Sequence, residues 1–328
     1  MCFCSIFLFV LSASAEYLNK AVVYLFIEHA EDLQNGLVSF LSFFGIGKGS
    51  ALAVSKLFLS SGIVFQFVSF VSVIVTMVLP AAIFSKAAGL SFDSTFRTDG
   101  KILGTAALFF CFIQLITTAV SQFSGYLYDF IVPSVPGIYD GSFTPSSPDV
   151  YSFIMSVLIT CILVPFAEEY VFRGVLFTYL KRYGLGFGII SSACLFGIAH
   201  ASPTQTVYAL VFGIFSALLV AVTGNIKTSI ILHSANNFVS VFFGYLQGAT
   251  NENISYIFSW LYCAVITAIA FFGIFLFVKD GGFADTFRQK ESQNDACIAE
   301  KNGMKQLLVF PFVVYVIIYA IDFTLKVM

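Results

Sequence analysis

Two adjacent glutamates and an arginine interrupt one of the most apolar stretches of the sequence. The stretch reads FAEEYVFRGVLF and contains Glu168, Glu169 and Arg173. An ionisable side chain in the middle of a membrane costs at least ~2.5 kcal/mol on insertion scales, so such residues usually mark an active site or an ion pathway. These two carboxylates and the guanidinium are therefore the first candidates for chemistry.

The spacing of these residues suggests different roles for the two glutamates. Glu169 and Arg173 are four residues apart with the glutamate first, which favours an ion pair on one helix face. Such a pair could be purely architectural. Glu168 projects about 100° away from Glu169 on a helix and stays available. Pro165 interrupts the helical backbone and is expected to start a new segment, whose first turns would then hold both carboxylates.

Two of the three histidines also lie in apolar segments, each with a partner four residues away. FGIAHA places His200 one turn after Phe196, and LHSANNF places Asn237 one turn after His233. Either histidine alone is more often a hydrogen-bonded core residue than a catalytic one. Together with Glu168 they form a set that favours function.

This set can hydrolyse an acyl or peptide bond. A glutamate beside a histidine can take a proton from water, while a second histidine and an asparagine amide can donate hydrogen bonds to an oxyanion. The sequence has no Gly-x-Ser-x-Gly elbow, no His-Glu-x-x-His helix and no cysteine beside a histidine, so water is the expected nucleophile. We expect no cofactor, but Glu168, His200 and His233 could alternatively hold a zinc ion that activates the water.

The elements that position these residues are membrane helices. The chain of 328 residues is 59% hydrophobic and 10% charged and contains 41 phenylalanines, which excludes an ordinary soluble domain. Apolar runs of about 20 residues predict an all-α, polytopic membrane helix bundle with about eight transmembrane helices. The predicted spans are 57–84, 102–123, 151–180, 187–200, 205–224, 228–247, 254–278 and 306–325.

The sequence divides into three parts. Residues 1–15 read as a signal peptide or an N-terminal anchor, because an apolar run ends in small residues but lacks a basic leader. Residues 16–56 are expected to be an external or interfacial segment, and residues 57–328 a membrane domain, in which the three polar motifs lie within a core at 151–245. Lysines and arginines gather in alternate loops, which places loop 124–150 and the C-terminus outside. The expected compartment is the plasma membrane, with the endoplasmic reticulum membrane as the alternative in a eukaryote.

Counting residues from the cytoplasmic helix ends tests whether the polar groups can meet. Glu168 and His200 each come out about 20 Å deep, whereas His233 comes out about 10 Å deep. Helix tilt can close this difference. The helix that ends at His200 is short for a membrane core, so its end should face protein or water.

Charge and cysteine content exclude several classes. The net charge of -2 gives no sign of nucleic-acid binding, and seven scattered cysteines form no metal-binding or disulfide pattern.

The motifs Glu-Glu-x-x-x-Arg, Phe-x-x-x-His and His-x-x-x-Asn, in this order, resemble those of the CAAX-processing and bacteriocin-processing (CPBP) intramembrane proteases. The resemblance implies that Glu168 and His200 activate water, that His233 and Asn237 stabilise the oxyanion, and that Glu169, Arg173 and Phe196 support the site. It also implies a glutamate-dependent or metal-dependent endopeptidase that cleaves a membrane-associated peptide or protein. The alternatives are a proton-coupled transporter or channel, for which an internal repeat is missing, and a non-catalytic scaffold or self-immunity protein.

Overall fold

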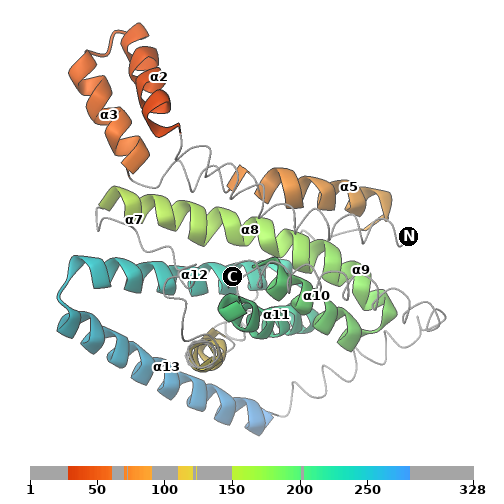
Figure 1. Cartoon of the computed structure of the whole chain (residues 1–328). Helices are drawn as coiled ribbons and strands as arrows, with labels where there is room; N and C mark the ends of the chain where they lie inside the picture. The colour runs from red at the N-terminus through yellow and green to blue at the C-terminus, as the bar shows by residue number, and fades with distance from the viewer. Residues whose placement is uncertain are drawn as a thin grey trace, which may run out of the picture.

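The computed structural model describes residues 29–60, 70–71, 73–90, 110–120, 123, 150–200 and 203–280. Every regular element among these residues is a helix, which confirms the predicted all-helical class (Figure 1). In this part of the chain, three helices are long and apolar enough to cross a membrane: Val150–Tyr183, Gln205–Thr223 and Asn253–Phe272. The predicted signal segment 1–15 and the predicted span 306–325 lie outside the described residues, so the count of eight stays a prediction.

The long helix Val150–Tyr183 carries the two glutamates. It runs through α7 (Val150–Ser156), α8 (Val164–Glu169) and α9 (Thr178–Leu180) and closes with a 3-10 turn at Lys181–Tyr183. Wide π-type turns at Val157–Leu163 and Tyr170–Phe177 join these three pieces without a break. Pro165 stands second in the segment α8, which begins at Val164 and holds both glutamates as expected, and the wide turn before it keeps the long helix continuous. Turns of this kind occur frequently at functional sites.

Four further helices follow in close succession. They are α10 (Leu185–Ala199), α11 (Pro203–Thr223), α12 (Ile226–Ala249) and α13 (Glu252–Asp280), near the bounds that the apolar runs predicted. Gly184 with φ 129° and Gly224 with φ 70° make the turns before α10 and α12, in backbone conformations that favour glycine. Asn225 caps α12, since its side-chain oxygen accepts a hydrogen bond from the Lys227 N–H at 3.0 Å.

Helices α10 and α11 pack closely enough that two of their glycines could not carry a side chain. A Cβ atom on Gly197 would lie 2.8 Å from the Thr206 carbonyl oxygen, and one on Gly213 would lie 3.0 Å from Cα of Ala193. Helices in lipid associate through this kind of close packing, because the bilayer gives no hydrophobic driving force between them. The close approach also brings the backbone of Gly213 to the site described below.

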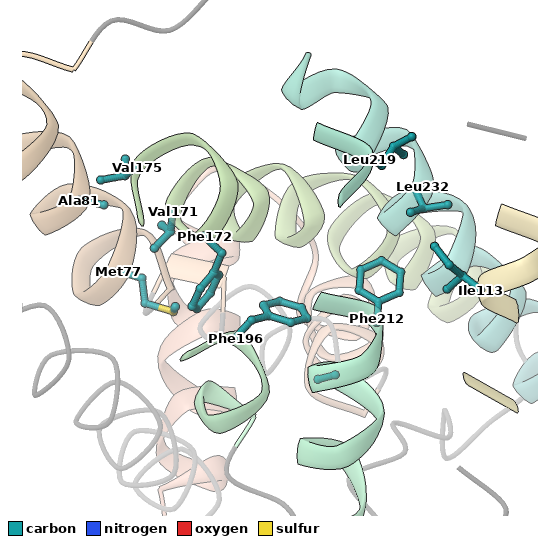
Figure 2. Close-up of a cluster of buried hydrophobic side chains, with 11 residues drawn as sticks. Met77, Ala81, Ile113, Val171, Phe172, Val175, Phe196, Phe212, Leu219 and Leu232 are labelled. Atoms are coloured by element: carbon teal, nitrogen blue, oxygen red, sulfur yellow. The ribbon is translucent and has the colours of Figure 1, made fainter. Parts of the chain in front are cut away.

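A core of apolar side chains holds the long helix against its neighbours (Figure 2). Met77 comes from the turn Ile74–Val78 and Ala81 from α5 (Leu79–Ala87), and both pack toward the segment Tyr170–Phe177 of the long helix. Phe172 meets Phe196 of α10 edge to face, with ring centres 5.1 Å apart. The remaining buried members of this core are Ile113, Val171, Val175, Ala209, Phe212, Leu219 and Leu232.

The N-terminal described residues form a pair of helices, α2 (Ala30–Phe43) and α3 (Lys48–Ser60) (Figure 1). The aromatic residues Phe40, Phe43 and Phe44 at the end of α2 are exposed. The predicted first span at 57–84 is covered in part, by the end of α3, the turn Ile74–Val78 and α5. Residues 61–69 of that span lie outside the described part.

Candidate active site

Glu169 and Arg173 form the ion pair that their spacing predicted. Arg173 Nη1 lies 3.1 Å from Glu169 Oε1, and both side chains are 0% exposed. Arg173 Nη2 also donates a hydrogen bond to the Gly213 carbonyl at 3.3 Å, and its guanidinium carbon lies 4.3 Å from the centre of the Phe196 ring. Ser216 Oγ donates to the other carboxylate oxygen of Glu169 at 3.0 Å. Each buried charge therefore has a partner, which is the condition for keeping it away from water.

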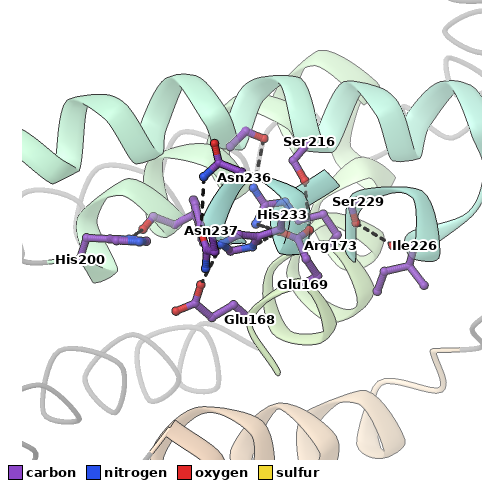
Figure 3. Close-up of polar contacts among 12 residues, drawn as sticks. Glu168, Glu169, Arg173, His200, Ser216, Ile226, Ser229, His233, Asn236 and Asn237 are labelled. Carbon is purple, nitrogen blue, oxygen red and sulfur yellow. Dashed lines mark hydrogen bonds and ion pairs between the residues drawn. The ribbon is translucent and has the colours of Figure 1, made fainter. Parts of the chain in front are cut away.

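His233 connects the two glutamates. Its Nδ1 lies 3.0 Å from Glu169 Oε1, and its Nε2 lies 3.7 Å from Glu168 Oε2 (Figure 3). The side chain of Glu168 is 18% exposed, whereas that of Glu169 is fully buried. The imidazole packs against Phe196 and Phe212, with ring centres 5.7 and 5.0 Å away. Aromatic walls and a buried carboxylate thus fix the ring, and its Nε2 edge faces Glu168.

His200 lies at the end of α10, at the edge of this group of side chains (Figure 3). Its Nδ1 hydrogen-bonds to the Phe196 carbonyl oxygen at 2.9 Å, and its ring packs against the Phe196 ring at 4.8 Å. A carbonyl only accepts, so Nδ1 carries the hydrogen and Nε2 of the neutral ring is an acceptor. The bond that the structure gives to His200 is with Phe196 and not with Glu168. The pairing of Glu168 with His200 stays a prediction.

Asn237 lies one turn after His233 on α12, and its side-chain amide is held at both ends. Nδ2 donates a hydrogen bond to the Thr160 carbonyl of the long helix at 2.9 Å. Oδ1 accepts a longer bond of 3.4 Å from Nδ2 of Asn236. An amide nitrogen has two hydrogens, so Asn237 keeps a second donor for a ligand.

A smaller polar cluster lies beside Asn237. Asn236 is 5% exposed, and its Nδ2 also donates to the hydroxyl of Tyr208. Its Oδ1 accepts a hydrogen bond of 2.7 Å from Nε2 of Gln114, which comes from the helix Phe110–Val120. The cluster links α11, α12 and that helix, so it ties the site to a part of the chain outside the three motifs.

The structure brings most of the predicted site residues together. Direct contacts link Glu168, Glu169, Arg173 and His233. Phe196 contacts Arg173 and the two histidines of the apolar helices, His200 and His233. The count of helical rises put His233 about 10 Å shallower than Glu168, and the two side chains nevertheless lie 3.7 Å apart, as the expected helix tilt allows.

Sequence reasoning missed Ser216, Gly213 and Asn236. Ser216 is a lone serine in the apolar helix α11, and Gly213 acts through its carbonyl, so neither gave a signal. Asn236 stands next to Asn237 in the quoted motif and could have been noticed for that reason.

The predicted zinc set is Glu168, His200 and His233. Among the described residues, no three His, Cys, Asp or Glu side chains are grouped so that they could hold a metal ion.

One comparison with known proteins gives a match. Residues 150–239 match the family described as Rce1-like, type II CAAX prenyl endopeptidase Rce1-like. The matched range contains all three motifs, from Glu168 to Asn237. No curated protein matches the chain, and no solved structure matches it.

Proposed function

Because residues 150–239 carry an Rce1-like domain of the CPBP protease type, we propose that this chain is an intramembrane endopeptidase in which Glu168 activates water. The family match supports a multi-pass membrane protein with a CAAX-type protease domain. The residue roles, the substrate and the compartment are our proposal. We propose the plasma membrane as the compartment and a membrane-associated peptide or protein as the substrate.

The observation that carries this proposal is the position of His233 between two unequal carboxylates. Glu169 is fully buried and paired with Arg173, so it is committed to holding Nδ1 of His233. Glu168 is partly exposed and faces Nε2 of the same ring at 3.7 Å. This spacing is longer than a hydrogen bond, and a carboxylate placed this way can still take a proton. One glutamate therefore orients the histidine and the other serves as the base.

The reaction follows from these placements. Glu168 removes a proton from a water molecule, whose second hydrogen is oriented by the acceptor nitrogen Nε2 of His200. The resulting hydroxide forms a bond to the carbonyl carbon of the substrate peptide. The carbonyl oxygen becomes an oxyanion and takes hydrogen bonds from Nε2–H of His233 and the second N–H of Asn237. The carbon–nitrogen bond then breaks, and the protonated Glu168 gives its proton to the leaving amine.

The general base and the oxyanion donors each have an expected contribution to the rate. General-base catalysis contributes about 10²- to 10⁴-fold, and one oxyanion donor about 10²- to 10³-fold. For His233 to donate from Nε2 while Nδ1–H donates to Glu169, both ring nitrogens must carry hydrogens.

The proposal can be tested in cells. Membrane peptides from cells that express the wild-type chain should contain cleavage products that are absent in cells expressing Glu168→Gln. The matched control is Glu252→Gln, which changes a glutamate at the start of α13, far along the chain from the motifs, and should leave the products unchanged. Identical peptide sets from the wild type and Glu168→Gln would show that Glu168 is not the base.

A further inference from the structure

The wide turn before Pro165 leaves one backbone carbonyl of the long helix without its usual donor. In the turn Val157–Leu163 the Val164 N–H donates to the Ile159 carbonyl, five residues back. The next donor in this pattern would be the N–H of residue 165, and its acceptor would be the carbonyl of Thr160. Proline has no N–H, so the Thr160 carbonyl must find another partner.

That partner is the side chain of Asn237. Its Nδ2 donates to the Thr160 carbonyl at 2.9 Å, across 77 residues of sequence. Pro165 itself is among the most completely buried residues of the described part. Asn237 thus supplies the donor that the Thr160 carbonyl lacks, and a carbonyl without a donor is costly wherever water does not reach it.

We infer that Pro165 is a positioning residue for Asn237: by leaving the Thr160 carbonyl free, it creates the anchor that orients the catalytic amide. One hydrogen of Nδ2 is committed to Thr160, and the direction of the other is then set by the planar geometry of the amide. The effect of Pro165 on catalysis rests on the proposed role of Asn237 at the oxyanion. The effect of Pro165 on the hydrogen bond between Asn237 and Thr160 does not depend on that role.

A second proline in the chain provides a matched control. Pro80 also stands second in its helix, α5, directly after a wide turn, and the Leu79 N–H donates to the Ile74 carbonyl five residues back. The backbone pattern around Pro80 is therefore the same as that around Pro165. Asn237 donates to Thr160 and not to this second turn, so a Pro80 variant should not affect it.

The substitution Pro165→Ala restores an N–H at the critical position. If the wide turn is kept, residue 165 donates to Thr160; if the turn tightens to an α-helix, residue 164 donates to Thr160 instead. The Thr160 carbonyl gains a backbone donor in both cases, and Asn237 loses its anchor. Pro165→Ser has the same consequence and serves as a second variant if the alanine chain fails to fold.

The first measurement is thermal unfolding of the full chain in detergent, in a double-mutant cycle. In the wild-type background, Asn237→Ala should lower Tm by about 2–4 °C, the effect of one lost hydrogen bond in a chain of this size. In the Pro165→Ala background it should lower Tm by less than half of that, whereas in the Pro80→Ala background the full shift should remain. Equal shifts in all three backgrounds would overturn the inference.

The second measurement is kcat and KM for a cleaved peptide. Pro165→Ala should lower kcat roughly 10- to 100-fold through misplacement of the amide, with KM little changed. In the Asn237→Ala background, Pro165→Ala should not lower kcat further. An active wild type with undiminished kcat for Pro165→Ala would contradict the positioning role. A third outcome is that the wild type cleaves no peptide although the Tm shifts of Pro165→Ala and Asn237→Ala are coupled. This outcome would support the hydrogen bond from Asn237 to Thr160 as an anchor and refute the proposed function.

Discussion

Nδ1 of His233 and Oε1 of Glu169 lie 3.0 Å apart, and the same carboxylate oxygen lies 3.1 Å from Nη1 of Arg173. A single buried oxygen thus joins a histidine of α12 to an arginine of the long helix. The arrangement explains how one motif can hold a second motif that comes more than sixty residues later. It also means that the ion pair and the histidine cannot be perturbed separately.

Removal of the arginine should therefore damage the fold and not only the chemistry. Arg173→Met leaves the Glu169 carboxylate buried without its counter-charge, which should lower the free energy of unfolding by about 3–5 kcal/mol. Thermal unfolding in detergent measures this loss. Arg182→Met is the control, because Arg182 is exposed and lies 5.7 Å from the centre of the Tyr179 ring. Equal shifts in Tm for the two variants would contradict the assigned role of Arg173.

The close contact of α10 and α11 predicts a strong difference between two glycines. A Cβ on Gly213 would lie 3.0 Å from Ala193 Cα and 3.3 Å from Arg173 Nη2, so Gly213→Ala should destabilise the chain by about 1–3 kcal/mol. A Cβ on Gly244 of α12 would have no atom within 4 Å, so Gly244→Ala should stabilise its helix by up to about 1 kcal/mol. Chemical or thermal unfolding of both variants checks the order. A reversed order would mean that the helices are farther apart than described.

The polar cluster beside Asn237 predicts a third loss of stability. Gln114→Leu removes the donor to Asn236 Oδ1 and leaves that buried oxygen unsatisfied, at a cost of about 1–3 kcal/mol. Gln247→Leu makes the same change at an exposed position on α12 and should have little effect. Comparable unfolding curves for the two variants would show that the Gln114 contact is unimportant.

Removal of metal ions distinguishes direct activation of water by Glu168 from activation by a bound zinc ion. If Glu168 and the two histidines act directly, dialysis against a chelator should leave the rate of peptide cleavage unchanged. The assay compares the dialysed protein with the same protein after zinc is added back. A rate that falls on dialysis and returns with zinc would assign Glu168, His200 and His233 as ligands instead.

The sequence predicted the helical class and the polar motifs, because both depend on residue types at short spacing. Apolar runs marked the helices from α10 to α13 closely, and the spacing of Glu169 and Arg173 predicted their ion pair. The continuity of the helix through Pro165 could not be predicted, since it depends on the wide turns at Val157–Leu163 and Tyr170–Phe177, which no short-range residue pattern marks.

The contacts of the histidines were also beyond sequence reasoning. The family resemblance implies that Glu168 acts with His200, and the structure adds a contact of 3.7 Å between Glu168 and His233 that no motif announced. Which histidine meets which glutamate depends on helix tilt and on the close approach at Gly213, and neither leaves a local pattern. Ser216 was missed for the same reason, because its hydrogen bond to Glu169 is defined only when α11 is packed in place.

The proposed function depends on Glu168 acting as the base that activates water. Its most direct test is the turnover of a cleaved peptide by purified chain in liposomes, for the wild type and for Glu168→Gln, with Tm measured on both. We expect Glu168→Gln to lower kcat by roughly 10²- to 10⁴-fold with an unchanged Tm, because the glutamine keeps the shape of the side chain but cannot take the proton. Turnover by Glu168→Gln at the wild-type rate would contradict this role of Glu168.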